Sequence, residues 1–313
     1  MQAIVQDAYG PPDVLELREI DRPVPKDNEV LVRVHAAGLD PGVWHLMTGL
    51  PYLVRLAFGP RRPKAPVRGT DVAGRVEAVG GKVTRVRPGD AVFGTCTGAF
   101  AEFACAREDR VAPKPANLSF EQAATVPVSA CAALHALRDQ GRVRPGQHVL
   151  VIGAAGGVGT FAVQLAKAFG AEVTAVCSTR HLDVVRSIGA DHVVDYTTTD
   201  ALGSGRRYDR ILDTVGNRSV SDLRRGLASG GKAAVTGFTS VAKLLGVSLR
   251  GGKDVAQVQA HVTAADLDLL SELLEAGKVR PRIDRRYRFA ELPAAIAYLE
   301  QGHARAKVVV EVA

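Results

Sequence analysis

The sequence predicts an α/β protein made of a β-rich domain and a second domain built on a doubly wound parallel sheet. Two features along the chain indicate this. Up to about residue 120, short apolar runs are separated by Gly and Pro, and beyond that point apolar strands alternate with helical segments. A length of 313 residues allows each domain a core of its own.

The first third of the chain has the pattern of a small β barrel. Residues 30–36 alternate apolar and polar side chains, as in a half-buried strand, and residues 70–79 form a second strand-like run that includes Gly74. A Pro-Gly-Asp turn at residues 88–90 then precedes the apolar residues 91–93. We expect strands on both sides of this turn.

The middle of the chain has the alternation expected of βαβ units. Ser119 and Gln122 are spaced as a capping box, which marks the start of a helix. Helical segments of about 10–15 residues then separate apolar strands, as in a parallel sheet. The strands are expected at residues 148–152, 172–177, 192–194, 210–213 and 232–236.

The end of the chain returns to a mixed pattern. An amphipathic helix is expected over residues 265–276, and Gly277 ends it. A helix over residues 292–299 and a strand over residues 307–312 close the chain. One domain is therefore interrupted by the other. The expected bounds are 1–121 and 264–313 for the β-rich domain and 122–263 for the parallel-sheet domain.

The composition excludes several classes of protein. A hydrophobic content of 46% and a charged content of 23% are typical of soluble globular proteins. No run of about 18 apolar residues is present, as a membrane-spanning helix would need, and the N-terminal residues do not resemble a signal peptide. The four cysteines have no regular spacing, which favours reduced thiols. We expect a cytoplasmic protein.

The net charge of +7 allows two interpretations. Either the protein has an anionic partner, or its arginines form a dispersed solvated surface beside a phosphate-bearing cofactor. The basic runs are short, and aromatic residues are only 5% of the chain, too few to suggest a surface for stacking bases. We favour the second interpretation and expect neither a nucleic acid nor a membrane among the partners.

The strongest chemical signal is a glycine-rich loop between an apolar strand and a helical segment. Glycine lets a backbone approach a pyrophosphate closely, and the N-terminus of a helix offers unpaired N–H groups. A strand–turn–helix context distinguishes this loop from an isolated glycine pattern. The residues expected to bind a dinucleotide here are Gly153, Gly156, Gly157, Val158 and Gly159.

The end of the following strand indicates which dinucleotide binds. A loop that selects NAD carries a carboxylate there for the ribose hydroxyls, whereas this chain has Ser178, with Arg180 two residues later. A hydroxyl and a guanidinium would bind a 2′-phosphate that a carboxylate would repel. Arg180 is alternatively an ordinary surface cation. The pattern favours NADPH over NADH.

Taken together, these landmarks resemble the medium-chain dehydrogenase/reductase superfamily, specifically its zinc-free quinone oxidoreductase branch. The resemblance covers nearly the whole chain and includes the glycine loop. The other matching segments are residues 69–74, 86–90, 187–191, 195–196 and 302–310. The resemblance implies a GroES-like catalytic domain formed from both chain ends, a Rossmann domain between them, and an active site in the cleft between the domains.

The resemblance also implies roles for particular segments. Tyr196 matches a tyrosine that lies beside the adenosine phosphate in relatives, so we add it to the cofactor-binding set. Many relatives are homodimers, and by analogy we expect residues 232–236 to form the dimer edge.

Zinc-containing members of the superfamily hold the metal with a cysteine, a histidine and a second cysteine or acid. The matching positions here are Asp40, Thr70 and Ser129, which are poor zinc ligands compared with thiolate and imidazole. Only Cys96 and Cys105 fall in the region of the structural zinc lobe. We expect no bound zinc.

Without a Lewis acid, reduction of a quinone or an α,β-unsaturated carbonyl is easier than reduction of a simple ketone, because the negative charge delocalises. We therefore expect a small quinone or enone as substrate. Two alternatives stay open. One is a dedicated biosynthetic enoyl or polyketide-type reductase, and the other is a non-catalytic NADPH-binding protein with a regulatory or RNA-binding role.

The candidate catalytic residues are Asp40 and His45, in the segment that matches the family's active-site loop. His45 could donate a proton near neutral pH, or could instead pack in the barrel or face solvent. Asp40 could hydrogen-bond the substrate, or cap a turn before Pro41. Trp44 and Tyr52, with Leu53 and Leu56, either line an apolar substrate cleft or belong to the core.

Overall fold

The computed structural model describes residues 1–237, 239–302 and 304–312. The chain divides into two compact units. The β-rich unit comprises Met1–Val128, Val262–Glu275 and Pro281–Ala313, and the Rossmann unit comprises Ser129–His261 and Ala276–Arg280. The domain bounds expected from the sequence stay a prediction, and position 303 of the matching segment 302–310 lies outside the described residues.

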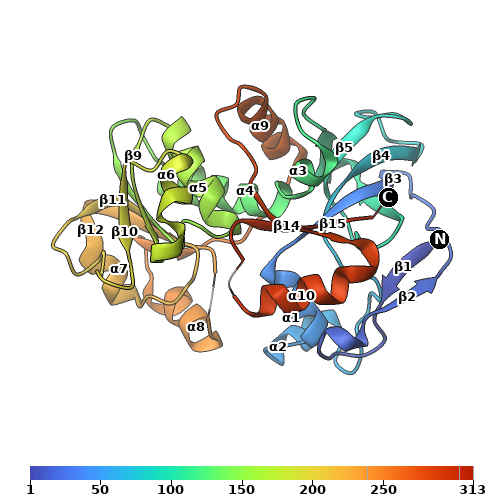
Figure 1. The fold of residues 1–313 in the computed structure, drawn as a ribbon, viewed down its shortest axis with the longest axis horizontal. Helices are drawn as coiled ribbons and strands as arrows, with labels where there is room; N and C mark the ends of the chain where they lie inside the picture. The colour runs from blue at the N-terminus through green and yellow to red at the C-terminus, as the bar shows by residue number, and fades with distance from the viewer. Residues whose placement is uncertain (238, 303, 313) are drawn as a thin grey trace. The chain divides into compact units, whose positions relative to one another are not determined.

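The β-rich unit contains a seven-stranded sheet and a two-stranded ribbon (Figure 1). The strands of the sheet run in the order β14-β15-β3-β4-β5-β7, and β6 pairs with β3. Their bounds are β3 Glu29–Leu39, β4 Asp71–Val79, β5 Ala91–Thr95, β6 Phe103–Arg107, β7 Val111–Pro113, β14 Ile283–Arg288 and β15 Lys307–Glu311, and the ribbon consists of β1 Gln2–Val5 and β2 Glu16–Glu19. The last strand of the chain, β15, thus pairs with β3 from the N-terminal segment.

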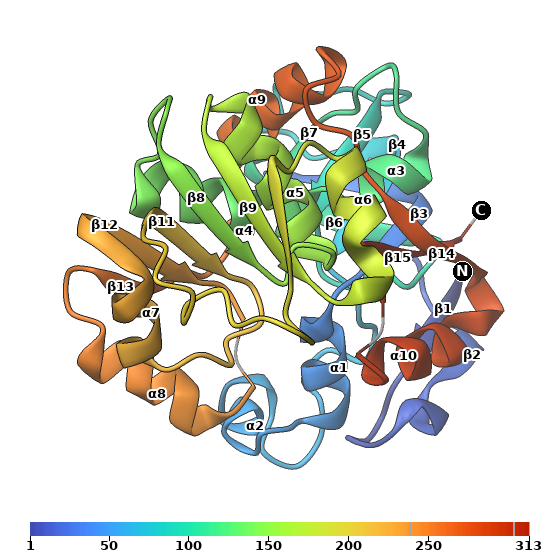
Figure 2. The ribbon, with the colours of Figure 1, turned by 60° about the vertical axis from the view of Figure 1, so that its left-hand side comes forward.

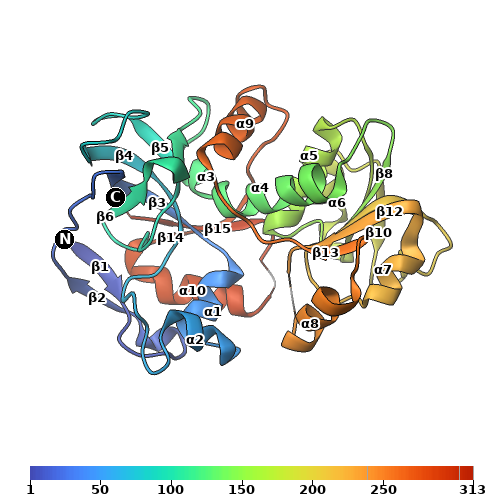
Figure 3. The ribbon, with the colours of Figure 1, turned by 180° about the vertical axis from the view of Figure 1, so that it is seen from behind.

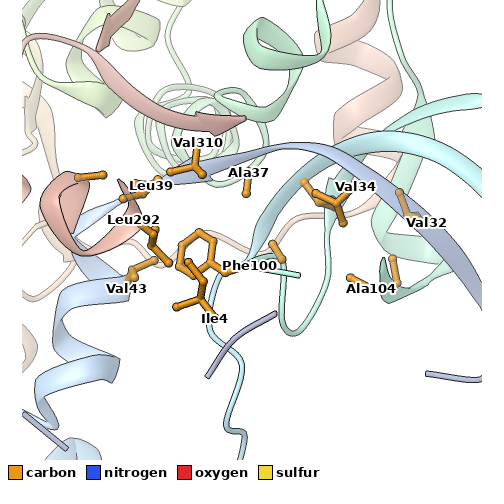
Figure 4. Packing of buried hydrophobic residues seen from close by; sticks show 14 of the residues in the cluster. Ile4, Val32, Val34, Ala37, Leu39, Val43, Phe100, Ala104, Leu292 and Val310 are labelled. Atoms are coloured by element: carbon orange, nitrogen blue, oxygen red, sulfur yellow. The ribbon is translucent and has the colours of Figure 1, made fainter. Parts of the chain in front are cut away.

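Strand β3 shows the alternation predicted for a half-buried strand. Between Val32 and Ala36 the apolar side chains are buried, whereas Arg33 is exposed and His35 is half-buried. The strand pairs with β4, β6 and β15 and therefore lies in the middle of the sheet. Figure 4 shows side chains from this strand packed beside Ile4, Phe100, Leu292 and Val310 in one core.

The helices of the β-rich unit follow local sequence signals. The capping box predicted at Ser119 and Gln122 is present at the start of α3 (Phe120–Ala124). Helix α9 (Ala264–Glu275) ends before Gly277, which has a φ of +65°. Helices α1 (Pro41–Thr48), α2 (Leu53–Phe58) and α10 (Leu292–Glu300) lie together at one end of this unit (Figures 1 and 3).

The Rossmann unit is built on a six-stranded sheet in the order β10-β9-β8-β11-β12-β13, with every neighbouring pair parallel (Figure 2). The strands are β8 His148–Ile152, β9 Glu172–Cys177, β10 His192–Asp195, β11 Tyr208–Asp213, β12 Leu227–Val235 and β13 Val255–Gln257. The chain order reverses between β8 and β11. In a doubly wound sheet the ligand crevice lies at such a reversal, beyond the carboxyl ends of the strands.

The helices in this part of the chain connect the parallel strands. Helices α5 and α6 pack against β8, β9 and β10, and α7 packs against β11, β12 and β13. The bounds are α4 Pro127–Leu134, α5 Gly157–Ala168, α6 Leu182–Ser187, α7 Val220–Gly226 and α8 Val241–Arg250. A π-helix (His135–Gly141) and four short 3-10 helices, Pro12–Val14, Glu108–Arg110, Thr179–His181 and Phe289–Glu291, complete the described elements.

One expectation about the sheet is corrected. Residues 232–236 were expected to form a dimer edge, but residues up to 235 belong to β12, which pairs with β11 on one side and β13 on the other. The sequence pattern of a buried strand does not reveal its neighbours, because β13 lies about twenty residues further along. Separately, no described helix has the length and apolarity needed to cross a membrane.

Candidate functional site

The glycine loop leaves β8 in a backbone conformation that favours glycine. Gly153 has a φ of +78°, and the N–H groups of Gly153 and Ala154 both donate to the carbonyl oxygen of Val176 on β9, at 3.1 and 3.0 Å. The N–H of Gly156 donates to the oxygen of Gly153 at 3.0 Å, and α5 begins at Gly157. The loop is therefore a tight turn that leads directly into a helix N-terminus, the arrangement that binds phosphates.

Two of these glycines have no room for a side chain. A Cβ on Gly159 would lie 2.1 Å from the oxygen of Gly153, and a Cβ on Gly153 would lie 2.5 Å from Oγ1 of Thr214. Both distances are far inside van der Waals contact. The bare backbone lets α5 pack closely on the turn, as the glycines of a dinucleotide-binding loop do. The described residues therefore fit a bound pyrophosphate.

The carboxyl ends of β9 and β10 bring three predicted cofactor residues together. Ser178 follows β9 directly and precedes a 3-10 turn that contains Arg180. Tyr196 follows β10, and its N–H donates to the oxygen of Cys177 at 3.0 Å. Arg180 and Tyr196 are exposed, and Ser178 is half-buried. These side chains share the sheet edge that also carries the glycine loop, since all the strands are parallel.

Arg180 has no ion pair with any carboxylate of the residues that the structure describes. The next two acids along the chain have other partners: Asp183 contacts Arg186 at 3.0 Å, and Asp191 contacts Lys167 at 2.8 Å. Partial burial alone would raise the pKa of Asp191. Hydrogen bonds from Lys167 and from the N–H of Val173, with the charge of Lys167, together outweigh this and hold the pKa below its usual value. Arg180 thus retains its donors for a ligand.

The carboxylate of Asp195, which belongs to the segment 195–196 that resembles the family, lies beside this edge. Asp195, the last residue of β10, accepts hydrogen bonds from the hydroxyls of Thr179 and Thr197 and from the Thr197 N–H. These bonds, the Thr179 hydroxyl first, lower the pKa of Asp195. Its oxygens are therefore occupied by protein donors, which leaves them less suited to bind ribose hydroxyls.

Sequence reasoning missed two residues that shape the crevice at the strand reversal. Asp213 is completely buried at the end of β11, and its Oδ1 accepts from the N–H groups of Val215 and Gly216, both at 2.9 Å. Thr214 donates its hydroxyl to the oxygen of Ile152 at 2.9 Å. The loop after β11 is thus fixed against the end of β8. The signal that could have identified Asp213 is its position as an acid at the end of an apolar strand.

In the β-rich unit, the structure assigns a structural role to Asp40. Its Oδ1 accepts from the N–H of Gly42 at 2.7 Å, and Pro41 occupies the first turn of α1, so Asp40 is the N-cap of this helix. His45 lies within α1, and its Nδ1 contacts the oxygen of Leu50 at 2.8 Å. Both residues belong to the segment that matches the active-site loop, and the structure holds each of them in place.

A buried ion pair lies next to this segment. Asp71 on β4 and Lys307 on β15 are almost completely buried, and Nζ of Lys307 lies 3.2 Å from Oδ2 of Asp71. The other oxygen of Asp71 accepts from the N–H of Val128 at 3.0 Å. Burial, with a smaller effect from the charge of Asp40, outweighs the opposing effect of Lys307 and raises the pKa of Asp71 to about 6. The sequence did not indicate this pair.

The four apolar residues near the active-site loop have different environments. Trp44 packs partly buried against the core of the β-rich unit. Tyr52, Leu53 and Leu56 are exposed. Core packing is therefore the correct interpretation for Trp44 and the wrong one for the other three residues.

Comparisons with known proteins agree with this architecture. Residues 26–116 match the family model described as an alcohol dehydrogenase GroES-like domain, and residues 188–310 match the one described as a zinc-binding dehydrogenase. A mitochondrial NAD(P)H oxidoreductase of Danio rerio is 35% identical, with 100% of this chain and 91% of the relative covered. A chloroplastic NADPH-dependent alkenal/one oxidoreductase of Arabidopsis thaliana is 34% identical, with coverage of 99% and 79%.

A solved structure gives the same result in three dimensions. The quinone oxidoreductase from Coxiella burnetii superposes with a TM-score of 0.90 at 30% identity, covering 100% of this chain and 99% of that one. The glycine loop lies where the strand order of the Rossmann sheet reverses, and the same chain also forms a GroES-like unit. This combination defines a nucleotide-dependent oxidoreductase. The chain belongs to the medium-chain dehydrogenase/reductase superfamily, in its quinone oxidoreductase-like branch.

Proposed function

We propose that this protein is an NADPH-dependent reductase that delivers a hydride to a quinone or an α,β-unsaturated carbonyl without zinc. Two observations carry the proposal. The glycine loop follows the end of β8, and Arg180 lies after the end of β9, where no carboxylate among the described residues pairs with it. The relatives reported above are named for NAD(P)H, for a quinone and for alkenals or enones, which supports the same chemistry.

The Rossmann unit supplies the groups that would hold the cofactor. Backbone N–H groups at Gly157, Val158 and Gly159 would face the pyrophosphate, and Gly153 and Gly156 would form the tight turn beside it. Ser178 and Arg180 would bind the 2′-phosphate, and Tyr196 would lie beside the adenosine. When bound, NADPH supplies the hydride for the reduction.

The donor chemistry of the β-rich unit supports a reaction without zinc. Among the residues that the structure describes, no group of three or more His, Cys, Asp or Glu side chains is placed to hold a metal ion. Asp40 already accepts a hydrogen bond as the helix cap. Quinones and enones need less electrophilic assistance than simple ketones, so they fit this environment best.

Asp40 and His45 are the proposed catalytic residues. Nδ1 of His45 contacts the oxygen of Leu50, and the imidazole would supply the proton to the reduced substrate. We expect His45→Gln to lower kcat by about 10²-fold or more, the usual contribution of a general acid. Asp40→Asn, which retains the N-cap, separates a role of the charge from a role in holding the helix. An unchanged kcat in His45→Gln, measured across pH 5–9, would remove this residue from the mechanism.

The proposed reaction is tested by following NADPH absorbance with 1,4-benzoquinone, 9,10-phenanthrenequinone and a simple enone, each with and without a chelator. We expect turnover that the chelator does not change. Loss of turnover with the chelator, restored by zinc, would refute the zinc-independent mechanism. Tight NADPH binding without turnover would favour a narrow enoyl or polyketide-type substrate, or the non-catalytic role. Salt-sensitive RNA binding by the apo protein would favour the non-catalytic role over the narrow substrate.

The homodimeric state and the cytoplasmic location stay predictions as well. Light scattering after gel filtration would check the first, and cell fractionation the second.

A further inference from the structure

Helix α2 turns its apolar side chains away from the protein. Tyr52, Leu53, Leu56 and Phe58 are 71%, 61%, 73% and 45% exposed. Tyr52 and Leu53 lie four and three residues before Leu56, so these three side chains share one face. A surface helix of a globular protein normally directs such a face toward the core. Four large exposed apolar residues within seven positions mark a surface that a partner covers.

The cationic residue of α2 holds the helix in this orientation. Nε of Arg55 donates to the oxygen of Gly49 at 3.1 Å, and Nη2 donates to the oxygen of Thr48 at 3.2 Å. Its guanidinium also lies over the rings of Tyr9 and Tyr52, 4.6 and 4.8 Å from their centroids. These contacts keep the polar side of α2 against the protein, so the apolar face stays outward.

A run of cations folds back onto the end of α2. The N–H of Lys64 donates to the oxygen of Phe58 at 2.9 Å. Arg61, Arg62 and Lys64 are exposed, and none forms an ion pair with a carboxylate among the described residues. Residues 41–70 contain no Asp or Glu at all. The positive charge beside the apolar face is therefore uncompensated.

We propose that Tyr52, Leu53, Leu56, Phe58, Arg61, Arg62 and Lys64 form a surface that docks on an anionic lipid bilayer. Exposed apolar side chains enter the boundary between headgroups and acyl chains, and neighbouring cations bind the anionic headgroups. Tyr52 is of the amphipathic aromatic type that is enriched at this boundary. A second copy of the chain is the less favourable occupant, because a symmetric contact would bring two sets of these cations together.

This inference revises the expectation that a membrane has no part among the partners. A protein that binds a bilayer from outside needs no apolar run long enough to span it, so the absence of such a run does not exclude this surface from membrane contact. The inference goes beyond the proposed reductase activity and is measured without turnover, so failure of one does not imply failure of the other. If both hold, the enzyme works at the surface of the phase in which lipophilic quinones dissolve.

The test is cosedimentation of the full chain with vesicles of phosphatidylglycerol and phosphatidylcholine, and with phosphatidylcholine alone. We expect binding to the anionic vesicles that weakens as salt rises. Arg61→Gln/Arg62→Gln/Lys64→Gln should lower the partition coefficient at least about tenfold, given the effect of each cation near a charged surface. Leu53→Gln/Leu56→Gln should lower it by a similar factor.

Matched controls separate this surface from net charge and from general hydrophobicity. Lys26→Gln/Lys82→Gln/Arg87→Gln removes the same charge from other exposed positions of the β-rich unit, and Leu17→Gln/Val24→Gln changes two exposed apolar residues off α2. Both controls should bind vesicles like the wild type.

Three outcomes would overturn the proposal. The first is absence of vesicle binding, or an equal loss of binding in the controls. The second is a change in the substrate KM of Leu53→Gln/Leu56→Gln while vesicle binding is unchanged, which would assign the face to the substrate. The third is a concentration-dependent dimer that this variant abolishes, which would assign the face to a second copy.

Discussion

Lys307→Met is expected to lower the free energy of unfolding by about 3–5 kcal/mol at pH 8, because it leaves the carboxylate of Asp71 buried without its partner. Asp71 has no access to solvent, and its remaining hydrogen bond comes from the N–H of Val128. The loss is measured by urea unfolding followed by circular dichroism. Asp71→Asn/Lys307→Met removes both charges while retaining an acceptor for Val128, so it should be less destabilised than Lys307→Met.

The unfolding free energy lost in Lys307→Met should increase as pH rises. Burial raises the pKa of Asp71 to about 6, well above the value of an unfolded aspartate, so the ionised carboxyl costs stability as pH rises through 6. Removing the ammonium raises the pKa of Asp71 further, because desolvation then acts alone. The difference between wild type and Lys307→Met should therefore be complete near pH 8 and should shrink toward pH 5. A difference of equal size at both pH values would show that lost packing, not charge, is responsible.

Arg180→Ala is expected to raise the KM for NADPH by about 10–100-fold, the loss of one or two charge-assisted hydrogen bonds to a phosphate, while the KM for NADH changes little. Arg180 lies directly after β9 in the exposed turn beyond Ser178, so its removal should not disturb the core. Steady-state kinetics with both coenzymes and a saturating quinone measure the effect.

Arg186→Ala is the matched control for coenzyme selection. Arg186 is an exposed arginine of the next helix, and it is paired with Asp183 at 3.0 Å. Arg186→Ala should leave the KM for NADPH and the KM for NADH near those of the wild type. If Arg180→Ala weakens NADPH and NADH equally, or neither, then Arg180 does not bind the 2′-phosphate and coenzyme selection has another basis.

The sequence by itself determined the features that depend on neighbouring residues. A capping box needs only Ser119 and Gln122, three positions apart, and it is present in the structure. The turn at Gly153 and the start of α5 at Gly157 likewise follow from a strand, a set of glycines and a helix in succession. Such elements depend on short-range backbone geometry and side-chain periodicity, so they can be predicted from the sequence.

The roles of the candidate catalytic residues were only partly predictable. Asp40 before Pro41 allowed either a cap or a substrate contact, and the hydrogen bond to Gly42 shows the cap. The position of His45 in α1 follows from local pattern, but its contact with Leu50 depends on how the chain turns after the helix. Local sequence therefore placed these residues in a segment without defining what their side chains touch.

Only the tertiary structure decided which distant residues meet. Asp71 and Lys307 are far apart in the chain, and they pair because β15 and β4 both lie against β3. The pairing of β12 with β13 removed the expected dimer edge, and the contacts of Arg55 turned the apolar face of α2 outward. Sheet order and the burial of a given face are properties of the folded chain as a whole, because they depend on partners that no local pattern identifies.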